Sequence, residues 1–197
     1  MKQKKIVLGI LLALVLLLGA AYLLYAKLGS SIAPNQLSAQ GAQDSAGGAP
    51  GASSQQPQPV PAPDFTVYDG DGNAVHLSDY VGKPVVMNFW ASWCGPCQME
   101  MPDFQAKHEE LGGEVQFLMI NMTGGRETLD SAQKFIAEQG YTFPVFYDTD
   151  SDAAITYGAY SLPTTYFIDA EGNAVAQATG AINGEILQTG IDMIYTP

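Results

Sequence analysis

The chain has 197 residues, which is enough for one ordinary domain with additional segments. Its formal net charge is −12, and residues 64–197 hold 19 of the 20 acidic side chains but only four of the eight basic ones. So acidic a surface makes nucleic acid and anionic lipid poor partners for this part of the chain, and is typical of a domain kept soluble in an extracellular setting.

Residues 1–28 are predicted to form a membrane anchor. Three lysines, Lys2, Lys4 and Lys5, precede an uncharged run of 21 residues from Ile6 to Ala26. As a helix this run would be about 31 Å long, enough to cross a bilayer core. A cleaved signal peptide is the alternative, although its apolar core is normally shorter. The lysines predict a cytoplasmic N-terminus, with the rest of the chain outside the cell membrane.

Residues 29–63 are rich in Gly, Ala, Ser, Gln and Pro and carry hardly any large apolar side chain. Such a segment cannot bury enough surface to offset the entropy that it would lose on ordering. We therefore predict a disordered tether, with a reach of roughly 30–35 Å as a flexible coil. The folded domain is predicted to run from Asp64 to Pro197.

Strands and helices alternate along the predicted domain. In chain order we expect short strands within Asp64–Tyr68 and Ala74–Leu77, a strand Val85–Trp90, a helix Gln98–Leu111, a strand Val115–Asn121, a helix Thr128–Gln139, a strand Val145–Tyr147, a helical turn Ala153–Tyr157, strands Thr164–Asp169 and Ala174–Thr179, and a helix Gly184–Ile194. This order predicts an α/β fold, in which a central mixed sheet has helices on both faces and an added N-terminal β-hairpin.

The only two cysteines, Cys94 and Cys97, lie between the strand that ends at Trp90 and the helix after them. In this context the Cys-x-x-Cys spacing is typical of a redox-active disulfide. The N-terminus of a helix favours a thiolate, so Cys94 is predicted to be the attacking nucleophile. Cys97, one turn further in, would then attack the mixed disulfide and release the reduced substrate. Pro96 suits the first turn, where its missing N–H has no partner to lose.

Other uses of the cysteine pair are less consistent with the sequence. A structural disulfide that closes so short a loop would remove little entropy from the unfolded chain. A zinc ion needs four ligands, and only His76 and His108 could join the two cysteines. Methionines near the pair offer copper soft ligands, but core packing explains most of their positions. We expect no metal, and no cofactor beyond the disulfide itself.

Two separated motifs resemble the thioredoxin superfamily. They are the stretch Trp90–Cys97, with the sequence WASWCGPC, and Ser161–Thr165, with the sequence SLPTT. Residues Asp64–Ile194 as a whole look like the membrane-anchored, extracytoplasmic TlpA/ResA-like branch of that superfamily. The resemblance implies a thioredoxin fold with the added N-terminal hairpin.

The resemblance also implies a substrate-binding surface around the cysteines. Pro163 would be a cis proline that faces the pair, a rare and deliberate backbone feature. It would turn the Leu162 backbone outward to pair with an extended substrate segment. Trp93, Gly95 and Pro96 would supply the rest of this surface.

A departure from the family pattern concerns the proton that Cys97 must lose. Cytoplasmic-type thioredoxins carry a buried aspartate where this chain has Asn88, and an amide cannot accept and release a proton. Glu100 lies one helical turn after Cys97 on the same face. The resemblance to ResA-like proteins implies that Glu100 is an active-site residue that handles the proton of Cys97 or tunes Cys94. The alternative is a solvated helix glutamate, because Glu is rarely buried unpaired.

These features together predict a membrane-tethered, extracytoplasmic thiol–disulfide oxidoreductase that reduces the disulfides of substrate proteins. The Gly95-Pro96 pair and the family resemblance favour reduction. The resemblance further implies a CcdA-like membrane electron donor, with apocytochrome c or an exported methionine sulfoxide reductase as the substrate protein. A disulfide-donating oxidase, and a copper-delivery module that uses the same thiols as ligands, are the two alternatives.

Overall fold

The computed structural model describes residues 38–39 and 59–197 of the chain. The predicted anchor, residues 1–28, lies outside the described residues, as does the predicted tether apart from residues 38–39 and 59–63. Within the described ranges, no helix combines the length and the apolar character that a membrane span requires.

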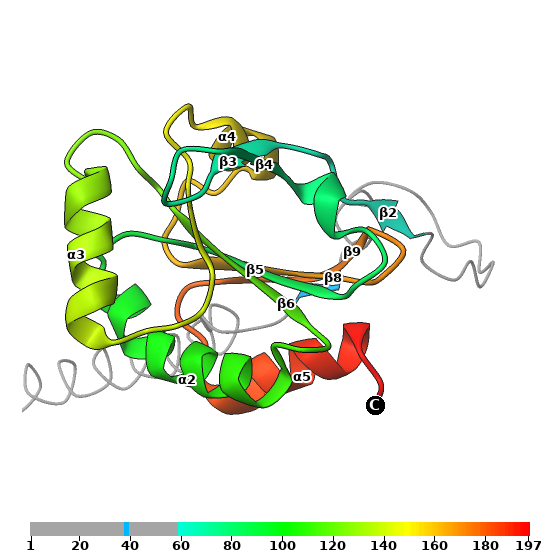
Figure 1. Ribbon diagram of the computed structural model, residues 1–197. Coiled ribbons are helices and arrows are strands. Elements are labelled where there is room, and N and C mark those ends of the chain that lie inside the picture. The colour runs from blue at the N-terminus through cyan, green and yellow to red at the C-terminus, as the bar shows by residue number, and fades with distance from the viewer. Residues whose placement is uncertain (1–37, 40–58) are drawn as a thin grey trace, which may run out of the picture. The chain divides into compact units, whose positions relative to one another are not determined.

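One mixed sheet is built around β5 (Val85–Trp90), the strand that leads to the cysteines. The neighbours of β5 are β6 (Gln116–Asn121), which runs parallel to it, and β8 (Thr164–Ile168), which runs antiparallel. β7 (Val145–Tyr147) lies parallel to β6, and β9 (Asn173–Thr179) lies antiparallel to β8. All six residues of β5 are buried, so it is covered on both faces, as its apolar sequence predicts (Figure 1).

The predicted N-terminal hairpin is confirmed. Its strands β3 (Thr66–Tyr68) and β4 (Ala74–His76) pair antiparallel, and β3 joins the sheet beside β7. On the other side of the sheet, β1 (Ser38–Ala39) and β2 (Val60–Pro61) both pair antiparallel with β9. The sheet therefore begins before the predicted domain boundary at Asp64. Composition missed these short strands because pairing of the backbone with an open sheet edge needs no apolar side chain.

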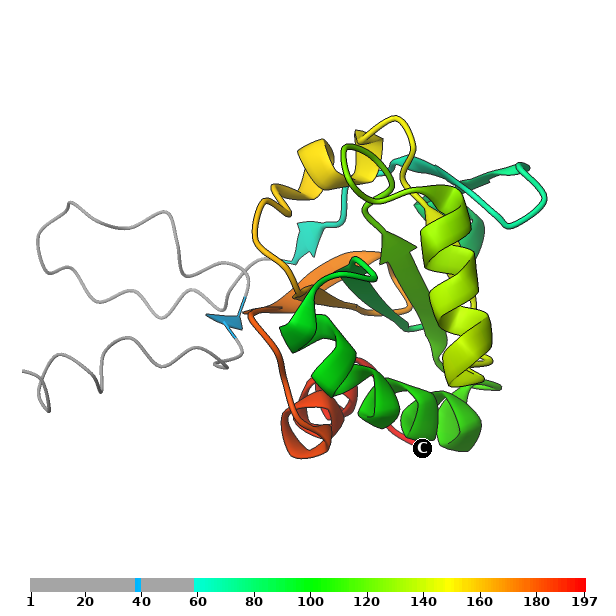
Figure 2. The same cartoon turned by 90° about the vertical axis from the view of Figure 1, so that its left-hand side faces the viewer.

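Helices cover both faces of the sheet, as predicted. One face packs against α2 (Gly95–Leu111), α3 (Leu129–Gln139) and α5 (Gly184–Ile194), and Figures 1 and 2 show α2 and α5 side by side there. The short helix α4 (Asp152–Tyr157) and the 3₁₀ helix η1 (Leu77–Tyr80) pack on the other face. Alternate residues of β5 belong to the two apolar clusters, which puts even-numbered positions on the side of α2.

Helix ends account for most differences from the predicted boundaries. The helix expected from Gln98 begins at Gly95, because Cys94 is its N-cap and Pro96 fits its first turn. α3 begins after Thr128, whose side chain accepts a hydrogen bond from the Ser131 N–H, and ends before Gly140. Gly140 has a φ of 70°, a left-handed conformation that glycine adopts without steric cost. The 3₁₀ helix η1 is too short to leave a periodic signal.

Gly190 brings α5 close to the sheet. A Cβ atom at this position would overlap the ring of Phe167, a fully buried residue of β8. We expect Gly190→Ala to lower the free energy of unfolding by about 1–3 kcal/mol, because overpacking outweighs the better helix propensity of Ala. Urea unfolding of the full-length chain measures the change. Gly113→Ala, where a Cβ meets nothing within 4 Å, is the control, and equal stability of the two variants would contradict the prediction.

Candidate active site

Cys94 and Cys97 form a disulfide at the N-terminus of α2, with their α-carbons 5.2 Å apart. The Cys97 N–H donates a hydrogen bond to Cys94 Sγ over 3.2 Å. Cys94 keeps 5% of its surface exposed and Cys97 none. An incoming sulfur can therefore reach Cys94 first, and a donor at the helix N-terminus is in place to stabilise its thiolate.

A groove beside Cys94 is lined by three segments that are distant in the sequence. The motif contributes Trp93, Cys94, Gly95 and Pro96, the loop after β6 contributes Met122 and Arg126, and the segment before β8 contributes Ala159, Tyr160 and Leu162. The structure thus brings together four of the residues that the sequence places in a substrate-binding surface. Pro163, Cys97 and Glu100 are buried and do not line the groove.

The Leu162–Pro163 peptide bond is cis, as the resemblance implies. The carbonyl of Pro163 accepts a hydrogen bond of 2.8 Å from the Gly180 N–H. Among the described residues, none forms a hydrogen bond with the N–H or the C=O of Leu162. These two groups are free to pair with an extended segment lying in the groove, in the manner of an added strand.

Glu100 is buried, with 2% of its surface exposed. Its Oε1 accepts a hydrogen bond from Asn88 Nδ2 at 2.8 Å, and its Oε2 accepts one from the Ile182 N–H at 2.9 Å. Burial raises the pKa of Glu100 to about 7, with a further contribution from the charge of Asp103, while the two hydrogen bonds partly oppose the shift. The alternative of a solvated glutamate is therefore wrong. The group exchanges protons near neutral pH, one helical turn from Cys97.

Asn88 connects Glu100 to the sheet. It lies on the α2 side of β5, and its Nδ2 also donates to Thr165 Oγ1 at 3.0 Å. Its buried Oδ1 has no hydrogen-bond partner among the described residues. If the amide turned over, Oδ1 could accept from a protonated Glu100 and from the Thr165 hydroxyl. Asn88 is thus able to serve both protonation states of the carboxyl, although it cannot carry the proton itself.

The loop between β6 and α3 supports the motif, although none of its residues was among the predicted site residues. Glu127 is buried, and its carboxylate accepts hydrogen bonds from the Ser92 N–H at 2.7 Å and from the Ser92 hydroxyl at 2.9 Å. Arg126, next to it, lies over the Trp93 ring, with Cζ 3.7 Å from the ring centroid. The signal in the sequence is the pair Gly124-Gly125, which two residues separate from the end of a buried parallel strand, because α/β sheets place their sites at the carboxyl ends of such strands.

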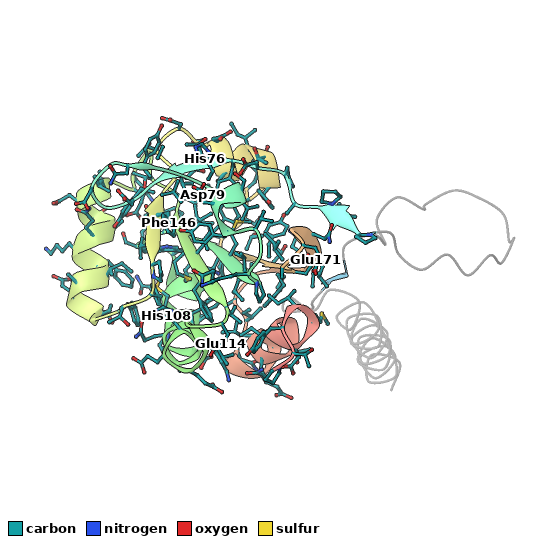
Figure 3. The ribbon with its side chains drawn as sticks, turned by 45° about the vertical axis from the view of Figure 1, so that its right-hand side comes forward. His76, Asp79, His108, Glu114, Phe146 and Glu171 are labelled. Carbon is teal, nitrogen blue, oxygen red and sulfur yellow. A yellow bond between two sulfur atoms is a disulfide. The ribbon has the colours of Figure 1, made fainter. Side chains whose placement is uncertain are left out.

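The described residues do not bring together the ligands that a zinc site would need. His76 and His108 lie on opposite sides of the domain (Figure 3). In the part of the chain that the structure describes, no three His, Cys, Asp or Glu side chains are placed to hold a metal ion together.

Comparisons with known proteins point to one group. The profile of the AhpC/TSA family matches residues 60–177. The thiol-disulfide oxidoreductase ResA of Bacillus subtilis (strain 168) is 35% identical over 135 residues, which cover 68% of this chain and 73% of that relative.

Solved structures of similar fold include two relatives that are at least 30% identical in sequence. The pneumococcal exposed lipoprotein thioredoxin Etrx1 of Streptococcus pneumoniae strain TIGR4 is 34% identical, with a TM-score of 0.58 over 66% of this chain and 99% of that one. A DsbF homologue from Corynebacterium diphtheriae is 30% identical, with a TM-score of 0.62 over 70% of this chain and 88% of that one.

Proposed function

Because the chain belongs to the AhpC/TSA family of the thioredoxin superfamily and is a thiol–disulfide oxidoreductase of the ResA/DsbE type, we propose that it reduces the disulfides of client proteins outside the cytoplasm. The observation that carries the proposal is the pairing of one accessible sulfur with one buried sulfur. Cys94 opens into a groove with a free backbone edge at Leu162, whereas Cys97 lies buried one turn from Glu100.

The reaction begins with the reduced pair. The Cys94 thiolate attacks one sulfur of the client disulfide, a mixed disulfide forms, and the other client sulfur leaves as a thiolate and takes up a proton. Glu100 then accepts the proton of the Cys97 thiol, and the Cys97 thiolate attacks Cys94 Sγ. The second client sulfur leaves and is protonated, and the Cys94–Cys97 disulfide remains. Two electrons have passed to the client, which ends as a dithiol.

Glu100 supports the reducing direction. When it is ionised, its charge beside the pair opposes a thiolate at either cysteine, which destabilises the reduced form relative to the uncharged disulfide. A reduced pair that is less stable is a stronger reductant. The hydrogen bond from the Cys97 N–H stabilises a thiolate at Cys94 and so favours the reduced form. The same bond, however, activates the accessible sulfur that must attack the client.

The reduction potential of the full-length protein tests the direction. We expect a value near that of thioredoxin, about −270 mV, from equilibration with glutathione or dithiothreitol buffers of known ratio. A value above about −180 mV, the potential of protein disulfide isomerase, would contradict the reductase proposal. It would favour the alternative of a disulfide-donating oxidase.

The placement outside the cytoplasm rests on residues 1–63. The proposed anchor, residues 1–28, combines the lysine cluster with the apolar run, and it would hold the domain near the membrane surface, where clients could be reached. In this compartment the oxidised pair must be reduced again from across the membrane, which a CcdA-like electron donor would do. Clients with the required disulfides would be apocytochrome c or an exported methionine sulfoxide reductase.

A further inference from the structure

Among the residues that the structure describes, Arg126 carries the one basic side chain that lines the groove beside Cys94. Its side chain is exposed, and within the described residues it forms no salt bridge. The other three basic residues of the domain lie elsewhere: Lys107 and Lys134 form salt bridges with Glu110 and Glu138, and Lys83 lines a separate pocket beside η1. A domain with 19 acidic residues therefore presents an unneutralised positive charge at its reactive sulfur.

The position of Arg126 is held from both sides. Its guanidinium stacks on Trp93, the residue before Cys94, in a cation–π contact. Glu127, the next residue, is tied through its carboxylate to Ser92 and to the hydroxyl of Ser131. The turn before Arg126 needs glycine, because Gly124 and Gly125 have φ angles of 154° and 59°. The guanidinium is thus held against Trp93 on an exposed residue that lines the groove.

The rest of the groove suits an extended peptide. Apolar and aromatic side chains line it, and Leu162 offers an unpaired N–H and C=O. In an extended segment whose cysteine meets Cys94, each residue advances about 3.3 Å. Because Arg126 stacks on the neighbour of Cys94, residues one or two places from the client cysteine pass within its reach. An arginine fork binds a carboxylate through two parallel hydrogen bonds.

We propose that this groove selects client segments with an Asp or Glu within two residues of the disulfide cysteine, and that Arg126 determines this specificity by binding the carboxylate. The inference rests on the proposed oxidoreductase function and names the class of substrate for the same site. Charge complementarity carries it, since among the described residues the groove lining holds the positive charge of Arg126 and no acidic side chain, so a client carboxylate has a partner there.

Disulfide-linked peptides of one sequence, with Glu, Gln or Lys on both sides of the cysteine, test the proposal. The pre-reduced full-length protein reduces each peptide, and each rate is divided by that of dithiothreitol with the same peptide, which removes the intrinsic reactivity of the disulfide. We expect the Glu peptide to be reduced about fivefold faster than the Gln peptide by this measure. The preference should shrink in 0.5 M salt.

Variants of Arg126 and Lys134 test whether Arg126 causes the preference for the Glu peptide. Arg126→Gln should bring the Glu and Gln peptides to equal rates, and Arg126→Glu should favour the Lys peptide. Lys134→Gln removes the same charge from an exposed position outside the groove and should leave the preference unchanged.

Three results would overturn the inference. One is an equal rate for the Glu and Gln peptides in the wild-type protein, which leaves the proposed function intact. Another is a slowing of all three peptides by the same factor in Arg126→Gln, because Arg126 would then act on the Cys94 thiolate and not on the client. The third is a wild-type protein that reduces none of the peptides although dithiothreitol does, which would overturn the proposed function as well.

Discussion

Loss of the Cys94 thiol in Cys94→Ser is expected to lower the rate of client disulfide reduction by at least about a thousandfold, the scale on which removal of a nucleophile acts. A serine hydroxyl is not ionised at neutral pH and cannot form a mixed disulfide. Single-turnover reduction of a disulfide-linked peptide by the pre-reduced full-length protein measures the effect.

Cys97→Ser should behave differently, because it keeps the accessible sulfur and removes the buried one. The first exchange should proceed, and the mixed disulfide with Cys94 should then accumulate. Captured clients can be identified by mass spectrometry after expression in cells, and Cys94→Ser/Cys97→Ser is the control for capture that does not depend on Cys94. Absence of any trapped protein would argue against dithiol exchange. Capture of cytoplasmic proteins in intact cells would contradict the proposed location.

Glu100→Gln is expected to slow the release of the client by about a hundredfold at pH 7, because the variant has no group that can accept the proton of Cys97. In the wild-type protein the rate of this step should rise with pH through about 7, as the buried carboxyl ionises, and this inflection should be absent from the variant. The single-turnover rate as a function of pH measures both effects. Glu109→Gln, an exposed change on the same helix, is the control.

The same variant distinguishes the two roles considered for Glu100. In a Cys97→Ser background only the first exchange takes place, so its rate reports on Cys94 alone. If Glu100 serves Cys97, adding Glu100→Gln to this background should change that rate little. A large change would assign Glu100 to the tuning of Cys94. A wild-type rate and pH profile in Glu100→Gln itself would contradict any role in catalysis.

The pH dependence of the free energy of unfolding should report the raised pKa of Glu100 independently of activity. Between pH 4.5 and about 7 the folded protein keeps a proton that the unfolded chain has lost, so this group makes the folded state less stable as the pH rises through that window. Glu100→Gln removes the effect. The stability of the variant relative to the wild type should therefore increase by up to about 3 kcal/mol from pH 4 to pH 8, as measured by urea unfolding.

An amide should fit this site. Glu100 has two hydrogen-bond donors facing it, Asn88 Nδ2 and the Ile182 N–H. With Asn88 turned over, its orphan Oδ1 would accept from the new amide while the Ile182 N–H kept its acceptor. The comparison across pH also cancels any structural cost of the substitution that does not depend on pH.

Local patterns determined most of the fold. The apolar run of β5, the turn and cap residues of α3 and the helical spacing in α5 each act over a few residues, so they can be read without knowledge of the rest of the chain. The short strands β1 and β2 could not be found in this way, because they depend on the open edge that β9 presents.

The sequence by itself also determined the chemistry of Cys94 and Cys97, since spacing, flanking strand and helix N-terminus are all local. Only the tertiary structure decided how that chemistry is supported. Burial between distant segments raises the pKa of Glu100, and the Ile182 N–H that binds its carboxylate comes from 82 residues further along the chain. The contact of Arg126 with Trp93 likewise depends on a loop that reaches the motif only because β6 lies beside β5. Contacts between distant segments leave no periodic pattern in a sequence, and these contacts set the proton exchange and the charge at the reactive sulfur.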